Sequence, residues 1–71
     1  MRIITSYLGV IYAVPSWTSY IAADEDGMVM AHEVFPEKWA HEWSPVDLAR
    51  WEVLFRPTVL IDNGWAEPKK I

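Results

Sequence analysis

The 71-residue chain contains no cysteine, which excludes disulfide bonds and thiolate zinc sites. It has only three glycines, too few for a glycine-rich phosphate-binding loop. There is no G-x-S-x-G motif, and the serines have no recognisable base near them in the sequence. We therefore expect a protein that is not an enzyme and that carries no cofactor.

Basic residues are few, and the formal net charge is −4 from ten acidic and six basic side chains. The pair Lys69–Lys70 is the only basic cluster, whereas nucleic-acid-binding proteins normally carry a basic patch. Direct binding to DNA or RNA is not expected. The acidic excess fits ordinary solubility, and it would also suit a partner with a basic surface.

No apolar run is long enough to span a bilayer. The run over residues 3–14 falls well short of the roughly 20 residues that a spanning helix needs. Arg2 precedes this run, as in a signal peptide, but a single positive side chain and the position of Pro15 fit cleavage poorly. A buried strand explains the same residues more simply. We therefore expect a cytoplasmic protein without membrane association.

Aromatic residues are abundant, with five Trp, three Tyr and two Phe. Each buried aromatic side chain removes roughly 150–250 Å² from water, so a few rings can form most of a small core. A core of this size does not comfortably hold five Trp, and we expect one or two at the surface, where Trp favours interfaces. The length predicts a single domain, 1–71, in which segments 1–7 and 66–71 could fray.

The first half of the chain has the pattern of β-strands. Leu8–Val14 is apolar on both alternating faces, which predicts a central strand that ends at Pro15. Trp17–Ala23 is aromatic and β-branched, an acidic turn ending in glycine follows, and Met28–Val34 returns. This order predicts a β-hairpin at the centre of the fold. The contiguous turn carboxylates do not match the spread ligands of an EF-type calcium loop.

The second half is more ambiguous. Residues 36–43 fit either one or two helical turns or a loop over the sheet edge. A possible cap at Ser44 predicts a helix over Pro45–Phe55, and the rival is a strand that begins at Trp51. Residues 58–61 resemble a strand and residues 62–64 a turn, after which Trp65 begins a short strand or folds over the core. The expected fold class is α+β: a small antiparallel sheet of three to five strands with one short helix packed on a face.

The predicted hairpin carries a family resemblance. It is similar to a hairpin pattern of small tailed-phage and prophage proteins, with these residues: Trp17-x-x-Tyr20-Ile21-Ala22-x-Asp24-x-Asp26-Gly27, then Pro36 and a nearby Trp. The similarity covers roughly residues 15–43, and the proteins that share the pattern are mostly uncharacterised. It implies a phage or prophage setting inside a bacterial host cell, and it carries over no catalytic residue.

Two histidines are each followed by a carboxylate, in His32–Glu33 and His41–Glu42. On facing elements they could supply a two-histidine, carboxylate metal site. Their spacing matches no standard ligand motif, and a strand over residues 28–34 would point His32 and Glu33 to opposite faces. We therefore expect no metal.

The aromatic residues after the hairpin are the candidate interface. An apolar centre of Phe35, Trp39 and Trp43 with a rim that includes Glu37 and Glu42 has the composition of a protein-binding surface. In the alternative, one Trp of the pair covers the sheet instead.

The resemblance and the composition together predict a non-enzymatic phage or prophage protein that binds and modulates a host protein of the defence or transcription machinery. The alternative function is a structural or self-assembling phage component, such as a homodimer. It rests on the apolar amino-terminal strand, because such a strand can pair at its edge with a second copy.

Overall fold

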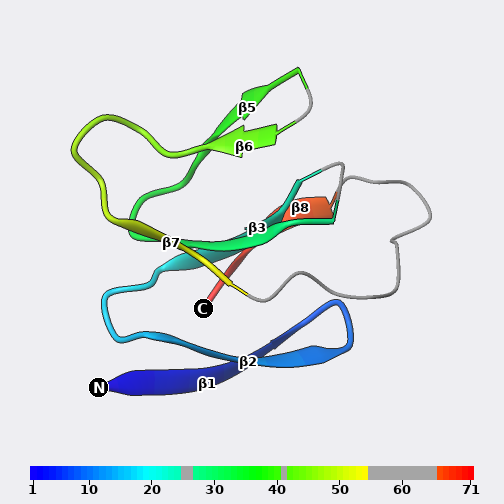
Figure 1. The fold of residues 1–71 in the computed structure, drawn as a ribbon, viewed down its shortest axis with the longest axis vertical. Coiled ribbons are helices and arrows are strands. Elements are labelled where there is room, and N and C mark those ends of the chain that lie inside the picture. The colour runs from blue at the N-terminus through cyan, green and yellow to red at the C-terminus, as the bar shows by residue number, and fades with distance from the viewer. Residues whose placement is uncertain (25–26, 41, 55–65) are drawn as a thin grey trace.

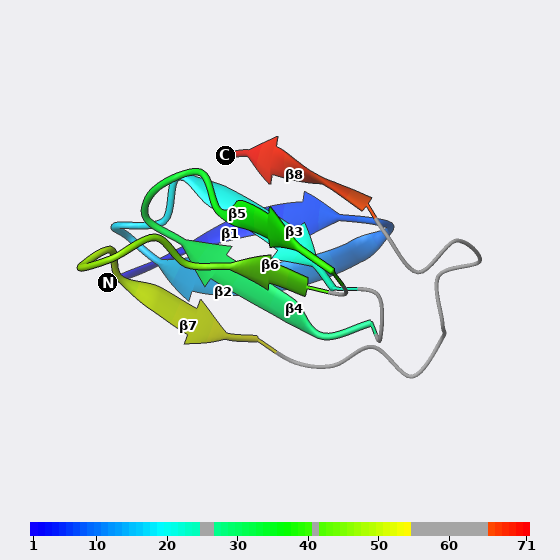
Figure 2. The ribbon, with the colours of Figure 1, turned by 90° about the horizontal axis from the view of Figure 1, so that it is seen from above.

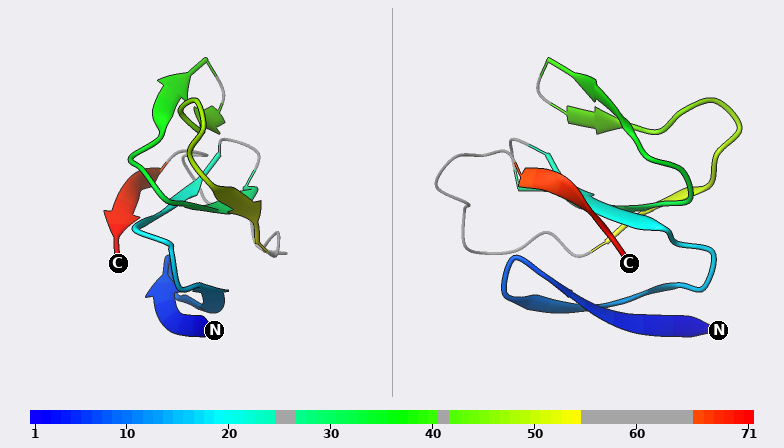
Figure 3. Two further views of the ribbon diagram at one scale, coloured as in Figure 1. Left: turned by 90° about the vertical axis from the view of Figure 1, so that its left-hand side faces the viewer. Right: turned by 180° about the vertical axis from the view of Figure 1, so that it is seen from behind.

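The computed structural model describes residues 1–24, 27–40, 42–54 and 66–71, and its elements there are all strands. In chain order these strands are β1 (Arg2–Tyr7), β2 (Val10–Pro15), β3 (Tyr20–Ala23), β4 (Val29–His32), β5 (Glu37–Trp39), β6 (Glu42–Ser44), β7 (Trp51–Val53) and β8 (Ala66–Lys70). A four-stranded antiparallel sheet has the order β7-β4-β3-β8, and it lies between the hairpins β1–β2 and β5–β6. Figures 1 and 3 show these three layers, and Figure 2 shows β7 and β8 at opposite edges of the sheet.

The expected α+β class is wrong, because the described residues contain no helix. In place of a helix over Pro45–Phe55, a turn closes with a 3.1 Å hydrogen bond from the Ala49 N–H to the Val46 carbonyl. Leu48 has a φ of 64°, which a right-handed helix cannot accommodate. The rival interpretation is confirmed, since Trp51 begins strand β7 and pairs with β4. Phe55 lies outside the described residues.

The prediction of a central strand over Leu8–Val14 is also wrong. Leu8 and Gly9 have φ values of 52° and 79°, which is the pattern of a two-residue type I′ turn. This turn pairs β2 with β1 in an outer hairpin, and within the described residues β2 pairs with no other strand. The second apolar face of β2 therefore points away from the sheet, and Ile11 is exposed.

The predicted hairpin is present at the centre of the sheet, with strands shorter than expected. Strands β3 and β4 pair antiparallel, with Ala23 opposite Val29 at the turn. Gly27 has a φ of 89°, and its N–H donates to the Asp24 carbonyl over 2.9 Å. Glycine adopts this conformation without a Cβ clash, which is why it ends the turn. Residues 25–26 lie outside the described ranges.

The main core lies between the β1–β2 hairpin and the sheet. Its buried residues are Tyr7, Tyr12, Val14, Ile21, Ala23, Val29 and Ala31. Because side chains alternate along a strand, the opposite face of β3 and β4 carries Tyr20, Ala22, Met30 and His32. The β5–β6 hairpin lies over this second face (Figure 1). The central strands are therefore covered on both sides.

The Tyr7 hydroxyl joins the outer hairpin to two strands of the sheet. Between β3 and β8 the register shifts, so that three steps along β8 oppose two along β3, and Pro68 of β8 has no N–H to donate. At this irregularity the Ala23 N–H donates to the Tyr7 oxygen, and the Tyr7 O–H donates to the Glu67 carbonyl, each over 3.2 Å. Burial raises the pKa of Tyr7, so the hydroxyl stays protonated as a donor.

Other predicted elements fall beyond the described ranges. The strand over residues 58–61, the turn over 62–64 and the placement of Trp65 all belong to this part of the chain. The segments 1–7 and 66–71 contribute β1 and β8. In the part that the structure describes, no helix has the length and apolarity needed to cross a membrane.

Replacing Tyr7 with Phe should lower the free energy of unfolding by about 1–3 kcal/mol, because the buried Ala23 N–H loses its acceptor. Urea unfolding measures this change. Tyr12→Phe is the matched control, since this Tyr is also buried and its hydroxyl makes no hydrogen bond within the described residues. Equal stability of the Tyr7→Phe protein and the unmodified protein would contradict the bridging role.

Candidate functional site

The β5–β6 hairpin has two chemically different faces. Its register places Lys38 opposite Trp43 and Trp39 opposite Glu42, so these two pairs lie on opposite faces. Trp43 is only 5% exposed, whereas Trp39 is 59% exposed. We call the face that carries Glu37, Trp39, Glu42 and Ser44 the outer face, and the face that carries Lys38 and Trp43 the inner face.

The inner face packs on the sheet through aromatic rings. The ring centroids of Tyr20 and Phe35 lie 5.2 Å apart, those of Phe35 and Trp43 lie 6.3 Å apart, and both pairs are edge-to-face. The Lys38 ammonium lies 5.9 Å from the Trp43 ring centroid, within range of a cation–π contact. The Trp43 ring thus lies near both the Phe35 ring and a cation of its own hairpin.

A buried carboxylate fixes the position of the hairpin backbone. Asp24 lies at the end of β3, and its Oδ1 accepts a 2.8 Å hydrogen bond from the Trp43 N–H. The backbone of Asp24 also closes its own turn, since its N–H donates to the Met28 carbonyl over 2.8 Å. The β5–β6 hairpin is therefore tied to the turn at the end of the central hairpin.

The structure gathers the five candidate interface residues but divides them between layers. Glu37, Trp39 and Glu42 share the outer face and are exposed, and Trp43 is buried beneath them. Phe35 is half-exposed at the edge of the inner cluster. The segment is neither of the two predicted alternatives, a helical turn or a loop, because it forms paired strands.

No protein-family model, curated protein or solved structure matches this chain. The function of the hairpin is therefore inferred from its own geometry and charge. Among the described residues, no group of three His, Asp or Glu side chains could hold a metal ion. His41, the second histidine of the metal site that the sequence analysis considered and did not expect, lies outside the described residues.

Glu33 and Arg50 form a charged cluster beside β4. Glu33 accepts hydrogen bonds from Arg50 Nε at 3.1 Å and Nη2 at 2.7 Å, and the Arg50 backbone N–H donates to its other oxygen at 3.0 Å. These hydrogen bonds hold the pKa of Glu33 below its ordinary value. The Arg50 guanidinium carbon also lies 5.3 Å from the Trp17 ring centroid. Arg50 thus contacts a carboxylate and an indole ring at the same time.

His32 is a buried titratable group on the sheet face below the β5–β6 hairpin. Its side chain is 1% exposed, and within the described residues neither ring nitrogen has a hydrogen-bond partner. Burial lowers the pKa of His32 to about 4, because a charged imidazolium would lie away from water. The folded protein therefore holds this residue neutral.

This shift in pKa predicts that stability falls as the pH is lowered. In the unfolded chain His32 binds a proton near its ordinary pKa of 6.5, whereas the folded protein binds it only near pH 4. Stability attributable to His32 is therefore complete above pH 6.5 and is lost progressively toward pH 4, by about 2 kcal/mol between pH 7.5 and 5. Urea unfolding of the unmodified protein and of His32→Leu over this range measures the difference. Parallel pH profiles of the two proteins would contradict the assignment.

Proposed function

We propose that this protein is a non-enzymatic phage or prophage protein that binds and modulates a host protein through the outer face of the β5–β6 hairpin. The phage setting rests on the resemblance of residues 15–43. The binding role rests on one observation above all, the exposed indole of Trp39 on a strand whose partner strand is anchored to the sheet.

Two physical features support this surface as an interface. A large ring with charged residues around it has the anatomy of a binding hot spot, in which an aromatic anchor supplies most of the affinity. The hairpin is also preorganised, because the Asp24 hydrogen bond and the packing of Trp43 fix its backbone. Preorganisation lowers the entropy cost of binding.

Affinity capture from nuclease-treated bacterial lysate, followed by mass spectrometry, tests the proposal. The unmodified protein should retain one host protein near stoichiometry, and Trp39→Ala should weaken that binding by about 30-fold, the effect of removing a hot-spot aromatic. Trp51→Ala is the matched control, since Trp51 is about equally exposed but lies on β7 in the sheet layer. Undiminished capture by Trp39→Ala, or recovery of the bait alone, would refute the proposal.

A second candidate function, self-assembly as a structural component, is favoured by the outer surface of the β1–β2 hairpin. Ile4 and Ile11 are 72% and 73% exposed on the same face, diagonal to one another, and their cross-strand partners Ala13 and Ser6 are uncharged. Arg2 is the charged residue on this face, at its end, and it is paired with Glu52, so the middle of the face is uncharged and two acidic chains can approach each other there. If this function is correct, light scattering should show a dimer or larger species that Ile4→Lys with Ile11→Lys converts to a monomer. A strict monomer at high concentration would exclude it.

A further inference from the structure

In the described part of the chain, one arginine contacts both a tryptophan ring and a glutamate carboxylate. The Arg50 guanidinium lies over the Trp17 ring and donates two hydrogen bonds to one oxygen of Glu33. A planar guanidinium can make both contacts together, because its face meets the ring while its N–H edges meet a carboxylate. Trp43 likewise has a cation from the chain, the ammonium of Lys38.

The outer face of the β5–β6 hairpin has the tryptophan and the glutamate of such a contact, but not the arginine. Glu42 is directly opposite Trp39, and residues so paired have Cβ atoms about 4.5–5.5 Å apart. Glu37 lies two residues before Trp39 on the same face of β5. Within the described residues no ion pair involves either glutamate, and no cation lies over the Trp39 ring.

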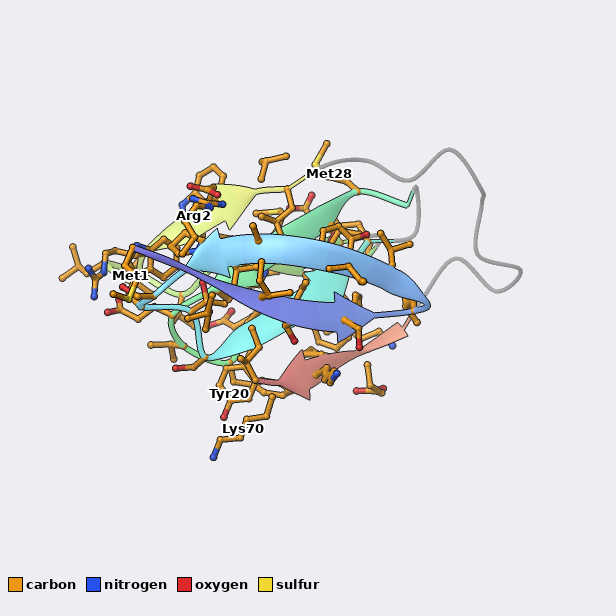
Figure 4. The ribbon with its side chains drawn as sticks, turned by 90° about the horizontal axis from the view of Figure 1, so that it is seen from below. Met1, Arg2, Tyr20, Met28 and Lys70 are labelled. Carbon is orange, nitrogen blue, oxygen red and sulfur yellow. The ribbon has the colours of Figure 1, made fainter. Side chains whose placement is uncertain are left out.

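The basic residues in the described part of the chain are mostly engaged elsewhere. Arg2 pairs with Glu52 at β7 and donates to the Ala13 carbonyl, and Lys69 donates to the Ser6 carbonyl over 2.6 Å. Lys70 lies near the end of β8, where its side chain points away from the body of the protein (Figure 4). With a net charge of −4 on the whole chain, a cation for Trp39 is best supplied by another molecule.

We infer that the outer face binds an arginine side chain of the partner protein, with the guanidinium on the Trp39 ring and its N–H groups donating to Glu42 and Glu37. The inference rests on the proposed function in taking the partner to be a protein. Arginine fits better than lysine because it is planar, donates along two edges and is more weakly hydrated. The contact reproduces between two molecules what Trp17, Arg50 and Glu33 form within one.

An NMR titration with a blocked peptide, acetyl-Gly-Arg-Gly-Arg-Gly-amide, tests this inference. The assigned indole N–H resonance of Trp39 should shift in a saturable manner, with a dissociation constant on the order of 1 mM for so small a ligand. A second peptide carries citrulline in place of arginine, which keeps the length and shape of the side chain but removes its charge. It should bind at least about 5-fold more weakly, because both the cation–π and the ionic contributions are lost.

The carboxylates are tested by the double variant Glu37→Gln with Glu42→Gln, which should weaken binding of the arginine peptide by about 3-fold or more. The matched control is Asp47→Asn with Glu67→Gln. It changes the net charge equally at two exposed positions outside the β5–β6 hairpin. Thermal unfolding verifies that both double variants fold, and the control should bind the peptide like the unmodified protein.

Three results would overturn the inference: an unshifted Trp39 resonance, equal binding of the citrulline peptide, or equal weakening by the control variant. The proposed function is judged separately by the capture experiment. A host protein that is lost with Trp39→Ala but retained by the Glu37→Gln, Glu42→Gln variant would sustain that function and reject the arginine site. Peptide binding at Trp39 without a captured host protein would sustain the arginine site and reject the proposed function.

Discussion

The hydrogen bond from the Trp43 N–H to the buried Asp24 carboxylate is the constraint on which the arrangement of the candidate site depends. It joins positions 19 residues apart, at the end of β3 and in β6. A bond from a backbone amide to a carboxylate is stronger than a neutral one, and low local dielectric strengthens it further. Trp43 of β6 is paired with Lys38 of β5, and the next residue along β5, Trp39, points to the opposite face. Fixing Trp43 inward therefore places Trp39 outward, on the face that carries Glu37 and Glu42.

The two hairpins are attached to the sheet by different means. The β1–β2 hairpin packs through an apolar core, and the Tyr7 hydroxyl adds a polar connection where β3 and β8 lose their regular pairing. The β5–β6 hairpin is attached through three aromatic rings and the Asp24 carboxylate. A chain without cysteine has no disulfide between layers, so side-chain packing and these polar bonds together orient one layer on the next.

The central hairpin could be predicted from sequence because its signals are local: alternating apolar residues and a turn that ends in glycine. Equally local capping signals predict a helix over residues 45–55. In the fold, Trp51 pairs with β4 in a strand instead, and Leu48 has a positive φ that a right-handed helix does not contain. The turn at Leu8–Gly9 has no clear signal in the sequence, because a β-turn rarely places leucine at positive φ.

The candidate site was predicted in composition but not in geometry. Trp39 and Trp43 are four residues apart, which matches one turn of helix, so the sequence could not show that a reversal puts them on opposite faces. The role of Asp24 could not be predicted either. Its acidic neighbours identify a turn, but its contact with Trp43 is made by a segment distant in sequence, and no local pattern encodes it.

The central claim is that the β5–β6 hairpin holds Trp43 inward and Trp39 outward. The most direct measurement is the broadening of assigned Trp ring resonances by a soluble paramagnetic probe, together with nuclear Overhauser effects between rings. The account predicts strong broadening for Trp39, protection for Trp43, and Overhauser effects from Trp43 to Phe35. Equal broadening of the two Trp rings would contradict it.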